Sequence, residues 1–394
     1  MPSQRQLFLN HLAQTSDAPL MLEMTSAEGV YMTDVDGKKY LDLISGIGVS
    51  NVGHRHPKVV EAIKNQVDKH LHVMVYGEFV QSPQVQLAEA LSKTLPEKLN
   101  SVYLVNSGSE AIEGAMKLAK RYTGRSGLVA CKNAYHGSSH GALSLTGSES
   151  FKRNYRPLLP GISHIEFGNK AELTNITEET AAFVVETVQG EAGVRQADKS
   201  YWTEVRKRCD ETGTLLILDE IQCGFGRTGK FWAFEHYGIQ PDVLVSAKGM
   251  GGGMPIGCFI SDREIMHVFT ENPVLGHIST FGGHPVSAAA SLATLQVIHE
   301  EDLLRGVSQK EQLFHQLLKH PKIREIRSKG LMMAIEFESF DVLKPIIDKA
   351  IELGAVTDWF LFDDRSMRIA PPLIITEEEI KKACNIILQA IDQV

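Results

Sequence analysis

Short apolar runs alternate with longer stretches of helical spacing through the middle of the chain, from about residue 100 to residue 260. An apolar run of a few residues, bounded by turn-forming residues, is typical of a strand buried on both faces. Strands that alternate with helices predict the α/β class, with a mostly parallel sheet wrapped by helices. The predicted strands are residues 102–105, 128–131, 163–167, 182–185, 214–218, 243–245 and 257–260.

The pattern changes on both sides of this region. A helix and a loop are predicted for residues 1–25, followed by a hairpin that turns at Asp36-Gly37 between strands at 30–34 and 39–43. A helix is predicted at 57–70, and long helices at 285–299 and 341–353 surround a strand at 331–338. Thr376 and Glu379 form a capping box that begins the last helix. We therefore expect a large domain at 50–285 and a smaller α+β domain built from 1–49 and 286–394.

Composition narrows the possible partners. With 394 residues, 43% of them hydrophobic, the chain can bury a large core, and its net charge of −8 without a dense basic run argues against nucleic acid or an anionic membrane. Residues 1–20 hold no sustained apolar stretch, so we expect neither a signal peptide nor a membrane span. Five cysteines without CxxC spacing are typical of reduced thiols in a cytoplasmic protein. The pairs His54/His56 and His136/His140 lack a Glu or Cys shell, so we interpret them as capping or packing residues and predict no metal site.

Two charged residues, Lys248 and Asp219, come just after predicted strands. Both should emerge at the carboxyl edge of one parallel sheet, where open α/β sheets bind ligands. A lysine that can form an imine, beside an aspartate that can hold a pyridinium nitrogen protonated, is the minimum apparatus for pyridoxal phosphate chemistry. Each residue alone has an ordinary explanation, as a solvated charge or a turn former.

A third motif, Asn106-Ser-Gly-Ser-Glu110, follows the strand at 102–105 and begins a helical pattern. Ser107 or Ser109 would cap that helix. Free backbone N–H groups, two hydroxyls and Gly108 at the positive end of a helix make an anion site. An ordinary capped helix would have the same sequence, but beside Lys248 and Asp219 the site has a phosphate to bind.

One glycine-rich segment points toward a different chemistry. Gly224-Phe-Gly-Arg-Thr-Gly229-Lys230 matches GxGxxG and nearly matches a P-loop. A P-loop needs Ser or Thr after the lysine to bind magnesium, and Phe231 stands there instead. The segment also lacks an immediate strand-to-helix setting, so we do not expect it to bind a nucleotide.

The motifs around Lys248 and Asp219 belong to a longer ordered series that spans essentially the whole chain. In chain order the segments are Asp34-Val-Asp-Gly-Lys-Lys-Tyr-Leu-Asp42, Gly53-His-Arg-His-Pro57, Asn106-Ser-Gly-Ser-Glu-Ala111, Ala134-Tyr-His-Gly137, Glu186-Thr-Val-Gln-Gly-Glu-Ala-Gly193, Leu218-Asp-Glu-Ile-Gln222, Lys248 and Arg368-Ile-Ala-Pro-Pro372. The series resembles the signature of class III pyridoxal-phosphate-dependent aminotransferases, of the acetylornithine, ornithine and putrescine type. The resemblance implies a fold-type I, aspartate-aminotransferase-like fold with a mostly parallel seven-stranded sheet. It also implies pyridoxal 5′-phosphate as cofactor and a homodimer with shared active sites.

The resemblance gives roles to individual residues. Lys248 matches the lysine that binds the cofactor and then shuttles a proton at the reacting carbon, and desolvation near a cationic ring would lower its pKa as both tasks require. Asp219 matches the partner of the pyridine nitrogen. Tyr135 matches an aromatic residue that stacks on the ring, although it could simply be a core residue, and Gln222 matches a contact to the phenolic oxygen. The positions that match cofactor contacts are Ser107, Gly108, Ser109, Tyr135, His136, Glu186, Asp219, Gln222, Lys248 and, from the partner chain, Thr280.

The family also pairs a glutamate, here Glu191, with a strand arginine, here Arg368. Arg368 would bind the α-carboxylate of glutamate or 2-oxoglutarate through two hydrogen bonds. Glu191 would neutralise Arg368 when the donor presents a terminal amine without an adjacent carboxylate. The alternative interpretation is a surface ion pair.

Two positions bear on the choice of donor. Acetylornithine and ornithine enzymes of this family usually carry an arginine after the aromatic-His-Gly motif, to bind the distal carboxylate of the donor, and Ser138 stands there. Ornithine enzymes also tend to place a tyrosine near Ile47. Arg153, Arg156 or Arg195 could replace the missing arginine from another direction.

We therefore expect transfer of an ω-amino group from acetylornithine, ornithine or a related amine to 2-oxoglutarate, giving glutamate and an aldehyde. A putrescine-type diamine or another ω-amino acid is an alternative donor. An aminomutase or decarboxylase of the same fold, or a phosphate-binding module without catalysis, is an alternative function.

Overall fold

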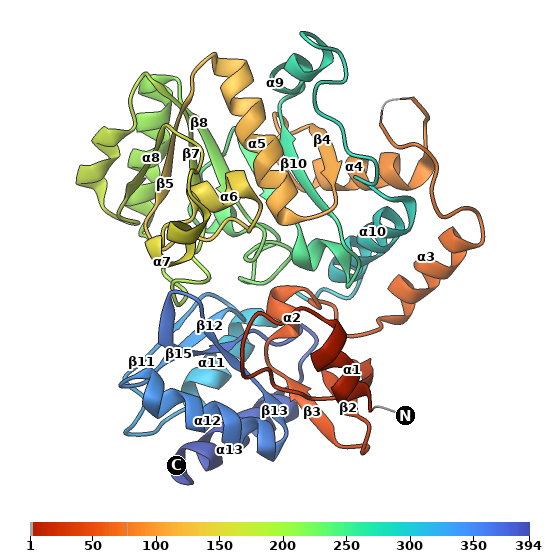
Figure 1. The fold of residues 1–394 in the computed structure, drawn as a ribbon, viewed down its shortest axis with the longest axis vertical. Helices are drawn as coiled ribbons and strands as arrows, with labels where there is room; N and C mark the ends of the chain where they lie inside the picture. The colour runs from red at the N-terminus through yellow and green to blue at the C-terminus, as the bar shows by residue number, and fades with distance from the viewer. Residues whose placement is uncertain (1–2, 77) are drawn as a thin grey trace.

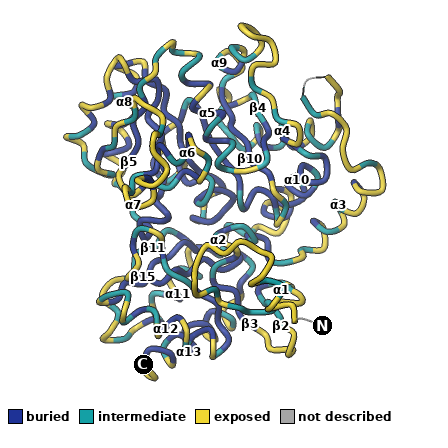
Figure 2. Tube along the Cα trace, in the orientation of Figure 1, coloured by how far each residue is buried: buried dark blue, intermediate teal, exposed yellow. Residues whose placement is uncertain are grey.

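The computed structural model describes residues 3–76 and 78–394, which form two lobes (Figure 1). The upper lobe in this view contains the central strands of the chain, and the lower lobe contains both chain ends. The buried positions follow the inner strands and helices of both lobes, and the exposed positions lie on outer helices and loops (Figure 2). Among the described residues, no helix is both long and apolar enough to cross a membrane.

A seven-stranded sheet organises the upper lobe, within the described residues, in the order β4-β10-β9-β8-β7-β5-β6. β10 pairs antiparallel with both of its neighbours, and the other pairs are parallel. Every residue of β7 to β10 is buried, as expected for strands covered on both faces. The strands are β4 (Ser101–Val105), β5 (Gly127–Cys131), β6 (Ile162–Ile165), β7 (Thr180–Glu186), β8 (Leu215–Asp219), β9 (Val243–Ser246) and β10 (Gly257–Ser261).

Alternate residues of these strands enter two different cores. On one face, Val184 and Ile217 pack with the apolar side of α5 (Gly108–Thr123). On the other face, Val185 and Leu218 belong to a core that includes residues of α3, α4, α8 and α10. The helices of this lobe are α3 (Pro57–Val67), α4 (Ser82–Lys93), α5, α6 (His140–Leu145), α7 (Glu149–Lys152), α8 (Lys199–Thr212), α9 (Arg263–Met266) and α10 (Pro285–Glu300), with short 3-10 helices η1 (Arg153–Tyr155), η2 (Lys170–Asn175), η3 (Ala233–His236), η4 (Lys248–Gly251) and η5 (His267–Thr270).

The lower lobe has two four-stranded sheets among the described residues, in the orders β1-β2-β3-β13 and β11-β12-β15-β14, with a shared apolar core. Its strands are β1 (Met24–Glu28), β2 (Tyr31–Asp34), β3 (Lys39–Asp42), β11 (Glu325–Ser328), β12 (Met333–Glu336), β13 (Ala355–Val356), β14 (Asp358–Phe360) and β15 (Asp363–Ile369). Its helices are α1 (Gln4–His11), α2 (Ser45–Gly48), α11 (Val307–Leu317), α12 (Phe340–Leu353) and α13 (Glu377–Asp392).

The α/β class, the mostly parallel seven-stranded sheet and the Thr376 capping box are confirmed. The prediction of a loop up to residue 25 was wrong at its end, because β1 begins at Met24 and extends the hairpin by a third strand. This strand is mostly exposed and polar, so it has no apolar alternation to reveal it. We propose the same two-lobe division as from the sequence, with one change. α10 packs against α3 and α4, so the second boundary lies near residue 300, not at 285.

Candidate active site

A cavity of about 540 Å³ lies at the carboxyl ends of the parallel strands. Residues from the segments that follow β4, β5, β8 and β9 line it, together with the end of β7. Among them are Ser107, Tyr135, Glu186, Asp219 and Lys248, which are scattered over the sequence. The volume is typical of a small-molecule site. The sheet therefore brings these five sequence-predicted residues into one cavity.

Lys248 begins η4 directly after β9, with a left-handed φ of 48°. A lysine rarely adopts this conformation, and such strain is often found at functional sites. Burial lowers the pKa of Lys248, and the positive charge of Arg368 adds to this, against the opposing influence of Glu191 and Asp219. A lowered pKa favours the neutral amine, which is the form that attacks an aldehyde.

Asp219 ends β8 and makes hydrogen bonds through both carboxylate oxygens. Oδ1 accepts the N–H of Ile221 at 2.9 Å, and Oδ2 lies 2.7 Å from Nδ1 of the buried His136. Burial lowers the pKa of His136, but the hydrogen bond and the charge of Asp219 outweigh it, so the net shift is upward. The sequence pattern predicted only a capping or packing role for the His136/His140 pair. His136 does more than pack, because its ring orients the carboxylate of Asp219.

The serine motif lies at the start of α5. Ser107 is the N-cap, and its Oγ accepts the N–H of Glu110 at 3.2 Å. Oγ of Ser109 lies 2.6 Å from Oγ of Ser139 and accepts the Ser139 N–H at 3.0 Å. Gly137 lies against this cluster, since a Cβ on it would come within 2.4 Å of the Ser109 hydroxyl oxygen. Ser107, Gly108 and Ser109 all line the cavity.

Glu186 holds the backbone on two sides of the cavity. Its carboxylate accepts the N–H of Tyr135 at 3.2 Å and the N–H of Gly190 at 3.0 Å. Burial raises the pKa of Glu186 to about 7. Tyr135 is half-buried and lines the cavity, so it is not a core residue. Gln222 also lines the cavity and donates a hydrogen bond from Nε2 to Glu191 Oε1 at 3.1 Å.

Glu191 and Arg368 form a buried ion pair. The two guanidinium N–H groups of Arg368 donate to the two carboxylate oxygens of Glu191 at 2.8 and 2.9 Å. Although burial raises the pKa of Glu191, the charge of Arg368 outweighs it and lowers that pKa to about 2. Because both side chains are buried, the interpretation as a surface ion pair was wrong.

The sequence did not reveal Asp358. It lies opposite Arg368 in the β14–β15 hairpin, and its Oδ1 accepts a hydrogen bond from Arg368 Nε at 2.9 Å. Burial raises the pKa of Asp358 to about 6. The register of the hairpin would have revealed this pair, but this pairing was not part of the sequence prediction.

The predicted substrate positions lie on two sides of the site. Ile47, with a left-handed φ of 65°, lines a small space beside Arg368. Ser138 lines the main cavity, and its Oγ lies 3.1 Å from the Tyr135 hydroxyl. Two of the possible replacement arginines already contact carboxylates: Arg156 pairs with Glu149, and Arg195 lies 3.7 Å from Asp363.

Two other predicted features lie outside the cavity. Thr280 is on an exposed loop, where its carbonyl oxygen lies 3.0 Å from Nε2 of His72, and it does not line the cavity of its own chain in the described structure. In the segment that resembled a P-loop, Arg227 is buried. Its guanidinium donates to the side chain of Asn51 and to the carbonyl oxygens of Leu331 and Pro371. That segment therefore connects the two lobes.

The residues around the cavity fit a phosphorylated pyridine aldehyde. The serine motif provides hydroxyls and N–H groups for a phosphate, and Lys248 provides an amine of lowered pKa for an aldehyde. Asp219 provides a carboxylate for a protonated ring nitrogen. Buried Nε2 of His136 has no hydrogen-bond partner among the described residues, so one polar atom at the cavity remains to be satisfied.

Known proteins resemble the chain over nearly its whole length. The model of the family "Aminotransferase class-III" matches residues 12–391. An acetylornithine aminotransferase of Methanocaldococcus jannaschii is 39% identical over 98% of this chain and 95% of its own length. A [LysW]-aminoadipate semialdehyde/glutamate semialdehyde transaminase of Sulfolobus acidocaldarius is 36% identical over 94% of this chain and 95% of its own length.

Solved structures agree in fold. A transaminase from the marine bacterium Virgibacillus superposes with a TM-score of 0.93 at 28% identity, over 99% of this chain and 98% of its own. The ornithine aminotransferase of Toxoplasma gondii, whose active site was described with partial occupancy of pyridoxal phosphate, gives 0.91 at 28% identity, over 98% of this chain and 93% of its own. Fold and similarity together define a pyridoxal-phosphate-dependent transaminase. The chain belongs to the class III aminotransferases, as its sequence motifs indicated.

Proposed function

We propose that this aminotransferase moves an ω-amino group from acetylornithine, ornithine or a related amine to 2-oxoglutarate, giving glutamate and an aldehyde. The observation that carries the proposal is the buried pair of Glu191 and Arg368. Both residues lie near enough to Lys248 for their charges to shift its pKa. An arginine that is already neutralised suits a donor whose amine has no adjacent carboxylate. The same arginine, once released, suits the carboxylate of a 2-oxo acid.

The residues of the cavity divide the chemical work. When bound, pyridoxal phosphate supplies an electron sink for the carbon that bears the amino group. Ser107, Gly108 and Ser109 would bind its phosphate, and Asp219 would keep its ring nitrogen protonated. Lys248 removes and returns a proton at the reacting carbon through its neutral amine.

Several contacts orient these groups. His136 and the N–H of Ile221 fix the two oxygens of Asp219. Tyr135 would cover the cofactor ring, and Gln222 would donate a hydrogen bond to the phenolic oxygen of the cofactor. Glu186 holds Tyr135 and Gly190 by their N–H groups, which keeps both sides of the cavity at a fixed separation.

Ser138 shapes the choice of donor. A hydroxyl cannot bind a distal carboxylate as an arginine does, so donors with an uncharged or cationic distal end compete well. The hydroxyl of Tyr135 lies 3.1 Å from Oγ of Ser138, and the ring of Tyr135 lies 6.4 Å from that of Phe362. The ring of Phe362 in turn lies 5.2 Å from that of Phe151, so an aromatic cluster extends away from Ser138. This environment favours a putrescine-type diamine or another ω-amino acid as the alternative donor. The named activities of the relatives favour acetylornithine.

The active unit is a homodimer in this proposal. Large exposed apolar side chains gather on segments 71–80 and 274–281, which are side by side because the rings of His72 and Phe281 lie 5.0 Å apart. Large apolar side chains exposed on neighbouring segments are typical of an interaction surface. Thr280 lies on it, so a second copy would bring Thr280 to the phosphate end of the partner's cavity. The exposed residues are Leu71, Val73, Met74, Phe79, Val80, Val274, Leu275, Ile278 and Phe281.

A panel of amine donors tests the proposal, with glutamate formed from 2-oxoglutarate as the readout. Acetylornithine, ornithine, putrescine and 4-aminobutyrate form the panel, and one of them should give glutamate at a rate that depends on 2-oxoglutarate. Turnover of a single substrate without any oxo acid would instead identify an aminomutase or decarboxylase. Borohydride reduction followed by peptide mapping should find the cofactor on Lys248, and a protein that never binds it would be a non-catalytic module.

A further inference from the structure

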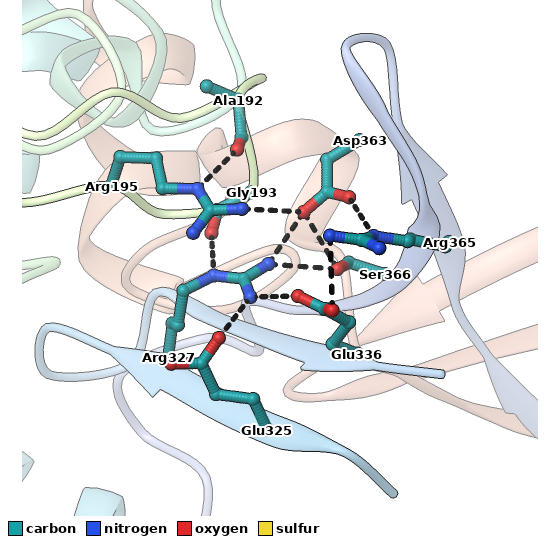
Figure 3. Close-up of polar contacts among 9 residues, drawn as sticks. All are labelled: Ala192, Gly193, Arg195, Glu325, Arg327, Glu336, Asp363, Arg365 and Ser366. Carbon is teal, nitrogen blue, oxygen red and sulfur yellow. Dashed lines mark hydrogen bonds and ion pairs between the residues drawn. The ribbon is translucent and has the colours of Figure 1, made fainter. Parts of the chain in front are cut away.

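Arg327 connects the loop that carries Glu191 to the strand that carries Arg368 (Figure 3). Its Nε donates to the carbonyl oxygen of Gly193 at 2.8 Å, two residues after Glu191. Its Nη2 donates to Asp363 at 2.6 Å and to Ser366 at 2.9 Å, both on β15 ahead of Arg368. One guanidinium group thus contacts both segments that carry the buried ion pair, through a backbone carbonyl on the loop and through two side chains on β15.

The remaining N–H groups of Arg327 are also used. Nη1 donates to Glu325 at 2.7 Å and to Glu336, so all five donors of the guanidinium have acceptors. The side chain is only 9% exposed. A planar group held at every donor has one orientation, and a lysine with a single ammonium cannot reproduce it.

Gly193 lies tightly against the lower lobe. Its φ is +83°, and a Cβ at this position would come 2.1 Å from Asp363 Oδ2 and 2.9 Å from Arg327 Nη2. No other residue allows the loop to approach β15 so closely without movement. The sequence therefore places a glycine where the loop meets the guanidinium.

The surrounding charges balance. Arg195 and Arg365 flank the cluster, and together with Arg327 they face the carboxylates of Glu325, Glu336 and Asp363 (Figure 3). Burial raises the pKa of Glu336, but Arg327 outweighs it and the net shift is downward. Arg365 differs from Arg327 in one respect. It contacts Glu336 and Asp363 from the exposed side, and no bond from it to loop 190–195 is found among the described residues.

We propose that Arg327 is a positioning residue for the exchange between Glu191 and a substrate carboxylate on Arg368. This inference rests on the proposed switch. The Glu191 side chain must leave Arg368 when a carboxylate binds, while its backbone stays anchored through Gly193. Arg327 thereby sets how strongly Glu191 competes for Arg368, although it contacts neither the cofactor site nor the substrate site.

The test measures binding of glutarate, a dicarboxylate that cannot accept an amino group, to the holoenzyme by calorimetry. The variants are Arg327→Lys, Glu191→Ala and the double variant, and Arg365→Lys is the matched control from the same cluster. Because a loosened loop weakens the competition from Glu191, Arg327→Lys should bind glutarate about fivefold more tightly, within the coupling typical of residues in one network. Rapid mixing with ornithine measures the amine half-reaction, and rapid mixing with glutamate measures the glutamate half-reaction. In Arg327→Lys the amine half-reaction should slow relative to the glutamate half-reaction.

The double variant decides between positioning and general stability. If Arg327 acts through Glu191, Arg327→Lys changes glutarate affinity less than about twofold in the Glu191→Ala background. Equal changes in both backgrounds, or the same change in Arg365→Lys, would overturn the inference. A Glu191→Ala variant with unchanged glutarate affinity would overturn the proposed switch itself, so the two failures are distinguishable.

Discussion

The side chains of Glu191 and Arg368 meet through two hydrogen bonds, of 2.8 and 2.9 Å, and each is only 5% exposed. A buried pair of this kind contributes little net stability, but breaking it by removing one partner leaves an uncompensated charge. Its position beside the cavity therefore matters more for specificity than for folding. Asp358 accepts a hydrogen bond from Nε of Arg368, so the guanidinium has a second carboxylate contact besides Glu191.

Replacing Glu191 with Ala should separate the two half-reactions. With an amine donor that has no adjacent carboxylate, the buried Arg368 loses both hydrogen bonds to Glu191 and keeps only Asp358 as a carboxylate partner, so this half-reaction should slow by at least about tenfold. The half-reaction with glutamate supplies its own carboxylate and should change much less. Rapid-mixing absorbance of the cofactor measures both. Glu191→Gln, which keeps the shape of the side chain, is the control for folding, and equal losses in both half-reactions would remove the switch.

Most of this site could be predicted from sequence because parallel strands deliver their carboxyl ends to one edge. Asp219 and Lys248 each follow a buried apolar run, so the fold class alone brought them together. The order of the motifs then identified Glu191 and Arg368. The structure adds how two of these residues are held: His136 contacts the carboxylate of Asp219, and Asp358 accepts a hydrogen bond from Arg368.

Other features had no local signal. β1 is polar and exposed, so nothing in its hydrophobic pattern distinguished it from a loop. The bonds of Arg327 join residues from three separate segments, and such a network depends on packing of the two lobes and not on spacing in the chain. The proposed role of Thr280 depends on a proposed second subunit, and a single chain carries no signal of it.

The pH dependence of stability should show the ion pair. The pKa of Glu191 falls to about 2 in the folded protein, from an ordinary value of 4.5, so its stabilising effect is complete above about pH 4.5 and is lost as pH falls toward 2. Only this pH-dependent part, the difference between the ionised and protonated forms of Glu191, amounts to about 3 kcal/mol at most, and the net contribution of the pair remains small because both charges are desolvated. Urea unfolding between pH 3 and pH 6 should therefore show that the free energy of unfolding falls less on acidification in Glu191→Gln than in the parent.

Asp358 gives the opposite sign and is the matched control. The pKa of Asp358 is raised to about 6 from an ordinary 3.8. The contribution of Asp358 to the free energy of unfolding is therefore fully present below about pH 3.8 and is lost as pH rises through 6. Asp358→Asn should remove that loss. It should leave unchanged the loss of stability at low pH that comes from Glu191. If the free energy of unfolding changed with pH in the same way in Glu191→Gln, in Asp358→Asn and in the parent, neither carboxylate would control the pH dependence of stability.

Asp219→Ala should reduce turnover by about 10²- to 10³-fold, the usual cost of removing a preorganised electrostatic partner. The covalent attachment at Lys248 should persist, because Lys248 does not depend on Asp219 for its position after β9. Steady-state assays measure turnover, and borohydride labelling with mass spectrometry measures attachment. A variant that loses both together would show that Asp219 mainly holds the cavity in shape.

Val80→Glu should dissociate the proposed homodimer. Val80 is 93% exposed in the isolated chain, and a charge buried there in an interface would be unpaired. Sedimentation velocity should show a shift from dimer to monomer, with a parallel loss of activity if Thr280 serves the neighbouring site. Val394→Glu, at an exposed residue of the C-terminus, is the control. A dimer that survives Val80→Glu would place the interface elsewhere.

Ser138→Arg should shift donor preference toward compounds with a distal carboxylate. The present side chain offers the cavity one hydroxyl, 3.1 Å from that of Tyr135, whereas an arginine offers a planar pair of donors. A charge-assisted pair of hydrogen bonds corresponds to about 10- to 100-fold in kcat/KM. We expect that gain for acetylornithine relative to putrescine, because putrescine presents a distal ammonium that the arginine repels.

Ser138→Ala is the control for this prediction. It removes only the hydrogen bond to Tyr135 and should leave the ratio of kcat/KM for the two donors nearly unchanged. A ratio that stays constant in Ser138→Arg would mean that the distal end of the donor lies away from residue 138, toward Phe151 and Phe362.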